Sequence, residues 1–214
     1  EKRIMMGRER QKSEKNKGFT LIEVIIVVAI FAILLGIMIP SLNSILGFHV
    51  RRTMESVSGA LDRTKTEAMN RLAAEFKLSY VEGDGYYITY YLDRGKSGGS
   101  DENIKEDQAE KIAPAKTRIS YTDDKGKSHN MWETGNTTLI LTYDRATGGF
   151  RQIQTEAIRQ EKILEQLAAG KDIAFHDSSS YCRSITIAGG GSTKRIDLNK
   201  EAGTYTVVNV KTGQ

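Results

Sequence analysis

The chain has 214 residues, 39% of them hydrophobic, and a formal net charge of +4, which is enough for one domain with appended segments. Residues 1–18 hold seven basic and three acidic side chains, so the net charge lies in this leader. The remaining residues are neutral overall, which argues against a large basic nucleic-acid surface, and the single cysteine, Cys182, excludes an intramolecular disulfide.

A long apolar stretch follows the basic leader directly. From Phe19 to Ile39 its only charged residue is Glu23. As a helix this stretch would be about 31 Å long, enough to cross a hydrocarbon core of roughly 30 Å. Because basic flanks stay on the cytoplasmic side, we expect residues 1–18 inside the cell and the residues after Pro40 to be exported.

The helical pattern continues beyond the apolar stretch. Apolar residues recur at steps of mostly three or four from Leu42 to Phe76, and charged residues occupy the opposite face. This periodicity predicts one helix from about Phe19 to Ala74, lipid-compatible in its first half and amphipathic in its second. Pro40 is expected to kink it.

Strand and turn patterns dominate the rest of the chain. Residues 76–93 predict two strands around the turn Gly83-Asp84-Gly85, and alternating apolar residues predict further strands within 117–126, 136–154 and 181–210. Two segments depart from this pattern. Residues 93–116 predict a long surface loop, and residues 155–169 predict a helix that ends at Gly170.

Together these elements predict an α+β fold. A long N-terminal helical spine, membrane-spanning and then amphipathic, would pack against a C-terminal antiparallel β-sheet head, because the apolar face of the sheet needs a cover. The expected parts are a basic cytoplasmic leader over residues 1–18, the spine over 19–80 and the exported head over 81–214.

Glu23 is the unusual residue of the apolar stretch, since a charge inside a membrane is costly. A cut between Gly18 and Phe19 would place the new amino terminus one helical turn from this carboxylate. In apolar surroundings an ammonium and a carboxylate attract each other strongly. They could pair within one chain, or between chains, where the pairing would set the register of neighbouring helices.

The sequence KGFTLIEV, followed by an apolar run and a proline, resembles the class III signal of type IV prepilins and type II secretion pseudopilins. The resemblance covers residues 15–40 only. It implies that a prepilin peptidase cleaves after Gly18 and N-methylates Phe19, and that Glu23 pairs with the amino terminus of a neighbouring subunit. The helix would hold the subunit in the cytoplasmic membrane and then pack in a pilus or pseudopilus.

The subgroup is indicated more faintly. Residues 184–207 resemble the closing strands of minor pseudopilins and minor pilins, and the long loop would be awkward on every subunit of a dense filament. A minor subunit is therefore favoured. Cys182 alone cannot form the cysteine pair that staples a loop in part of the family.

Two other functions stay open. Arg183, Lys194 and Arg195 lie near a predicted hairpin and could contact DNA, as in the minor pilins of this family that serve DNA uptake. Acidic residues beside them and the neutral mature chain favour a solvated strand face instead. The second alternative is a plain membrane-anchored exported domain that no peptidase cleaves at Gly18.

No pattern indicates an enzyme, a cofactor or a metal site. The order of residues in Gly189–Lys194 is wrong for a phosphate-binding loop. Asp101, Asn103 and Asp107 lack the Gly and Glu that a calcium loop requires. The histidines are far apart in the sequence. We expect the protein to act by assembly rather than by catalysis.

Overall fold

The computed structural model describes residues 19–70, 73–93, 104–106, 109–158, 166, 168–170 and 175–210. The chain forms two compact units, residues 1–40 and 41–214. One helix, α1 (Leu21–Asn70), supplies residues to both units. The predicted long helix is thus confirmed. The kink at Pro40 stays a prediction, and in the described part of the chain no helix is both long and apolar enough to cross a membrane.

The end of the helix differs from the prediction. Helix α1 ends at Asn70, and Ala74 and Phe76 belong to a strand, β1 (Ala73–Val81). This strand is hydrogen-bonded on both sides, with Ala74 opposite Leu92 and Phe76 opposite Leu141. The apolar residues here fit a period of two as well as a helical period, and pairing with two neighbouring strands decides between them.

The first sheet is antiparallel and has five strands. Besides β1 it contains β2 (Gly85–Asp93), β3 (Ile104–Glu106), β4 (Glu110–Pro114) and β7 (Thr138–Thr142). The order is β3-β2-β1-β7, and β4 also pairs with β2. The predicted hairpin is confirmed, because β1 and β2 join through residues 82–84 with Val81 opposite Gly85.

The prediction of a loop over residues 93–116 was partly wrong, because Ile104–Glu106 forms β3 and pairs with β2. Glu110–Pro114 forms β4, which pairs with β2 and buries Ile112 and Ala113. A polar start, Glu110-Lys111, hides this short strand in the sequence. The scattered acidic residues Asp101, Asn103 and Asp107 lie outside the described residues.

The second sheet is also antiparallel and five-stranded. It contains β5 (Arg118–Asp123), β6 (Ser128–Asn130), β8 (Cys182–Gly189), β9 (Ser192–Asn199) and β10 (Thr204–Val210). The order is β10-β9-β8-β5-β6. The strands predicted within residues 117–126 and 181–210 are confirmed. Residues 155–158 of the predicted helix are not helical, 166 and 168 are helical, and 159–165 and 167 lie outside the described residues.

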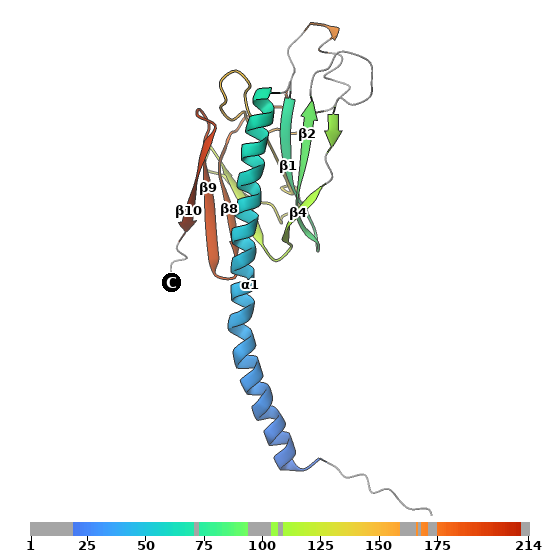
Figure 1. Ribbon diagram of the computed structural model, residues 1–214, viewed down its shortest axis with the longest axis vertical. Helices are drawn as coiled ribbons and strands as arrows, with labels where there is room; N and C mark the ends of the chain where they lie inside the picture. Colours follow the sequence, from blue (N-terminus) through green and yellow to red (C-terminus); the bar gives the residue numbers. More distant parts are fainter. Residues whose placement is uncertain are drawn as a thin grey trace, which may run out of the picture. The chain divides into compact units, whose positions relative to one another are not determined.

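The amphipathic half of α1 covers both sheets of the head (Figure 1). Its buried positions recur at helical spacing and are Val50, Thr53, Val57, Ala60, Leu61, Thr64 and Ala68. The apolar ones among them share one core with Phe76 of the first sheet and Ile185 of the second. Burying side chains of this size contributes roughly 1.5–3 kcal/mol each to folding. The fold is α+β, as predicted.

Candidate functional site

The start of α1 is closed by a reciprocal pair of side chains. The Thr20 N–H donates to Glu23 Oε2 over 2.9 Å, and the Glu23 N–H donates to Thr20 Oγ1 over 3.3 Å. The Thr20 hydroxyl also donates to Glu23 Oε2 over 3.0 Å. This is a capping box, in which Thr20 is the N-cap and Glu23 the third residue of the helix. Glu23 therefore has a local task that holds whether or not a second chain is present.

The second carboxylate oxygen of Glu23 can accept a further hydrogen bond. Among the described residues, only Oε2 of this carboxylate is engaged, and the side chain is exposed. An exposed oxygen at a helix start can accept a hydrogen bond from an ammonium group. Thr20 did not enter the sequence prediction, although the spacing Thr20-x-x-Glu23 is the sequence signature of a capping box.

The first turns of α1 present an apolar surface on all sides. Every large apolar side chain from Phe19 to Leu35 is exposed, between 47% for Val27 and 85% for Phe19. Soluble monomers rarely expose a contiguous apolar surface of this kind. This part of the helix therefore needs a cover of lipid or of other protein chains. Phe19 belongs to this surface, whereas Gly18 lies outside the described residues.

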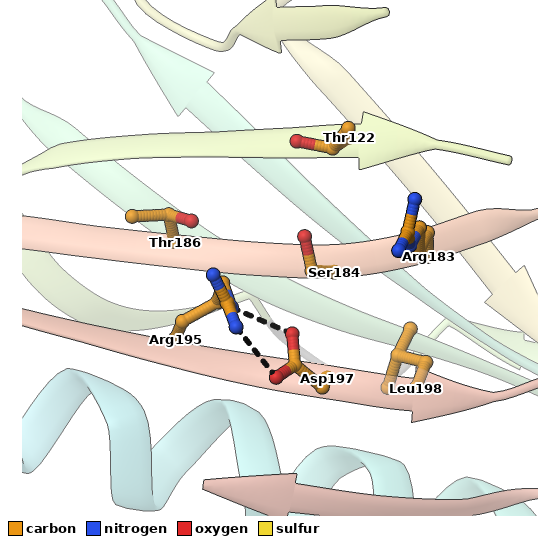
Figure 2. A pocket seen from close by; sticks show the side chains of 7 residues that line it. All are labelled: Thr122, Arg183, Ser184, Thr186, Arg195, Asp197 and Leu198. Carbon is orange, nitrogen blue, oxygen red and sulfur yellow. Dashed lines mark hydrogen bonds and ion pairs between the residues drawn. The ribbon is translucent and has the colours of Figure 1, made fainter. Parts of the chain in front are cut away.

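The structure brings together two of the three basic residues proposed for DNA, Arg183 and Arg195, and separates the third, Lys194. Lys194 and Arg195 are neighbours in β9, so their side chains lie on opposite faces of the sheet. Lys194 shares the face of the core residue Ile196 and donates to Asn209 Oδ1 over 2.7 Å. Arg195 lies on the outer face with Arg183, where both line one pocket (Figure 2). A DNA contact by all three residues stays a prediction.

Cys182 lies in the core and is a structural cysteine. Its side chain is buried, and burial strongly raises the pKa of the thiol, so the reactive thiolate is disfavoured.

His129 and Asp123 form a hydrogen-bonded pair in the second sheet. His129 Nε2 lies 3.1 Å from Asp123 Oδ2, and the His129 ring stacks on Tyr121. Burial acts to raise the pKa of Asp123, but hydrogen bonds from His129 and from backbone N–H groups outweigh it and lower that pKa. This cluster fixes the β5–β6 turn.

A buried carboxyl group on the other sheet escaped the sequence analysis. Glu75 is completely buried, and its Oε2 accepts the Ile158 N–H over 2.8 Å. Its Oε1 has no hydrogen-bond partner among the described residues. Burial raises the pKa of Glu75 to about 8, the Ile158 hydrogen bond opposes this, and the charge of Asp177 adds to it. Glu75 is thus a neutral acid at pH 7 that ties the segment before β8 to β1.

Comparison with known proteins gives one match. Residues 14–39 match the family model described as the prokaryotic N-terminal methylation motif. No curated protein and no solved structure matches the chain. The matched range includes the leader end, the capping box and the apolar surface of α1.

Proposed function

Because residues 14–39 carry the N-terminal methylation motif typical of prepilins and pseudopilins, we propose that the protein is a structural subunit of a type IV pilus or a type II secretion pseudopilus. A prepilin peptidase cleaves between Gly18 and Phe19 and methylates the new amine of Phe19. The mature subunit then assembles with other subunits through α1. The chain acts by assembly rather than by catalysis.

The exposed apolar surface of α1 is the observation that carries this proposal. Large apolar side chains from Phe19 to Leu35 are not covered by any of the described residues. In the proposed cycle they are covered twice, first by the lipid of the cytoplasmic membrane and later by the helices of neighbouring subunits. The leader stays on the cytoplasmic side and the head on the outer side. Both covers are apolar, so the transfer between them costs little hydrophobic free energy.

Glu23 sets the register of assembly in this proposal. Its Oε2 closes its own helix through Thr20, while the other oxygen accepts the methylated ammonium of a neighbouring subunit's Phe19. Two unit charges about 4 Å apart attract by about 4 kcal/mol at an effective dielectric constant of about 20. The capping box limits the rotamers of Glu23, so less side-chain entropy is lost when the neighbour binds.

We place the protein among minor subunits. Its head has a long connection between β7 (Thr138–Thr142) and β8 (Cys182–Gly189), part of which packs over the outer face of the first sheet through Ile158 and Phe175. An enlarged head of this kind suits a subunit present in few copies better than one repeated along a dense filament.

Intact-mass measurement tests the processing step. Co-expression with a prepilin peptidase is expected to remove residues 1–18 and add one methyl group. Gly18→Ala is expected to block cleavage, whereas Glu23→Ala is expected to be cleaved and yet to enter filaments poorly. Glu55→Ala, which removes an exposed carboxylate of α1 outside the motif, is the matched control and should be cleaved and assembled normally. An uncut wild-type chain would refute the proposal and favour a plain membrane-anchored domain.

A further inference from the structure

The outer face of the second sheet carries a polar pocket of about 450 Å³. Its lining comes from three adjacent strands, β5, β8 and β9 (Figure 2). The lining residues are Thr122, Arg183, Ser184, Thr186, Arg195, Asp197 and Leu198. No lysine and no aromatic ring lies among them, so the pocket offers no stacking platform for a sugar or a base.

The sheet register explains why these polar groups gather. Ile185 and Ile187 of β8 lie in the core, so Ser184 and Thr186 point to the outer face. Ser184 lies opposite Thr122 on one side and Asp197 on the other. The pairing of β5 and β8 skips Arg183, which is the extra residue of a β-bulge. A bulge redirects the side chain, and it brings Arg183 to the pocket beside Ser184.

The hydrogen-bond donors of the pocket are largely unused. Within the part of the chain that the structure describes, no hydrogen bond or ion pair is formed by the side chains of Arg183, Ser184 or Thr186. Ser184 is only 7% exposed, so its hydroxyl group lies at the floor. None of these donors is among the buried unsatisfied atoms of the described residues, so they are open to an acceptor that enters the pocket.

The two arginines differ in their availability. Arg195 holds Asp197 through two hydrogen bonds, Nε to Oδ1 over 2.7 Å and NH2 to Oδ2 over 3.0 Å. This carboxylate neutralises Arg195 and repels further negative charge. Arg183 supplies the one positive charge of the pocket that is not neutralised by a lining residue. The pocket is therefore suited to a single negative charge rather than to a dianion or a run of phosphates.

We propose that this pocket binds a carboxylate group. The planar fork of the Arg183 guanidinium matches the two oxygens of a carboxylate, and the hydroxyl groups of Ser184 and Thr186 donate to the same oxygens. Arg195 and Asp197 show the same pairing within the pocket itself. The carboxylate belongs to a small acid or to an acidic side chain of another protein chain, and both present the same chemistry to Arg183.

Titration of the full-length protein in an uncharged detergent tests the proposal. Backbone NMR shifts of β8 and β9 are followed while sodium acetate replaces sodium chloride at constant ionic strength. The second probe is a capped Gly-Glu-Gly peptide and the third is inorganic phosphate. The variants are Arg183→Gln, Asp197→Asn and, as a matched loss of an exposed arginine elsewhere in the head, Arg145→Gln.

Wild type and Arg145→Gln are expected to show shifts centred on Ser184 with either carboxylate. Arg183→Gln should weaken the binding by about tenfold or more, as expected for the loss of a charge-assisted pair. Asp197→Asn should strengthen it by about threefold to tenfold, because Arg195 becomes available. Equal affinity for acetate and peptide would identify a small acid as the source, and a preference for the peptide would identify an acidic side chain.

Three results would overturn the proposal. The first is the absence of shifts near Ser184, the second is equal binding by wild type and Arg183→Gln, and the third is tighter binding of phosphate than of either carboxylate. The exposed side chain of Arg183 makes failure of this variant to fold unexpected, and unchanged amide spectra away from the pocket would verify its fold.

Discussion

The buried carboxyl of Glu75 makes the stability of the head depend on pH in an unusual direction. Its pKa is about 8 in the folded protein, against an ordinary value of 4.5. Between these values the unfolded chain loses the proton while the folded chain keeps it. Stability is therefore lost as the pH rises from 4.5 towards 8, and the loss is complete above pH 8. Most paired carboxylates act in the opposite direction.

The magnitude follows from the two pKa values. At about 1.4 kcal/mol per pKa unit, the difference between 4.5 and about 8 corresponds to a loss of about 5 kcal/mol from this group. Full burial of Glu75 leaves little solvent screening to reduce it. Glu75→Gln keeps an acceptor for the Ile158 N–H and cannot ionise. We expect this variant to be more stable than wild type above pH 8 by several kcal/mol.

Urea unfolding of the full-length protein between pH 5 and pH 9 measures this difference. Fluorescence of Trp132, the single tryptophan of the chain, follows the head because this residue packs on Arg118 of β5. The free energy of unfolding of wild type should fall relative to that of Glu75→Gln as the pH rises. A constant difference between the two proteins from pH 5 to pH 9 would refute the assignment of a neutral, buried Glu75.

Three further predictions concern the head and the start of α1. Leu61→Ala removes a completely buried side chain from the core and should lower the free energy of unfolding by about 2–5 kcal/mol, measured in urea. Gly203→Ala should be much more destabilising than Gly170→Ala in the same assay. Both glycines have a positive φ, but only at Gly203 would an added Cβ collide with the backbone of Gly148. Equal losses of stability in the two variants would contradict this. Thr20→Ala should lower the stability of the start of α1 by about 1 kcal/mol. The expected sign is faster amide hydrogen exchange in the first turn of α1, and unchanged exchange would argue against the capping box.

Local sequence patterns were sufficient for the processing signal and for much of the fold. The signal is a short linear motif, so residues 14–39 can be recognised without a structure, while the roles of Phe19 and Glu23 stay predictions. The β1–β2 hairpin was predictable because Gly83-Asp84-Gly85 is a typical turn sequence, and Gly83 has the positive φ that glycine adopts without strain. Helical spacing likewise predicted the buried face of α1.

Features that depend on distant contacts were not predictable. The alternation of apolar and polar residues around Glu75 is typical of a strand with one solvated face. Glu75 is nevertheless buried, because Ile158, 83 residues further along the chain, packs against it. Similarly, Arg183 and Arg195 line the same pocket because β8 has a bulge where it pairs with β5. A pattern of residue types within one strand contains no information on either arrangement.

The continuity of α1 has a mechanical consequence. The helix that bears the apolar surface also supplies Val50, Val57 and Leu61 to the core of the head. In the proposed assembly, a pull on the second half of α1 therefore reaches the two sheets of the head through these buried side-chain contacts. We expect the tension that the head can bear to be limited by the strength of this core.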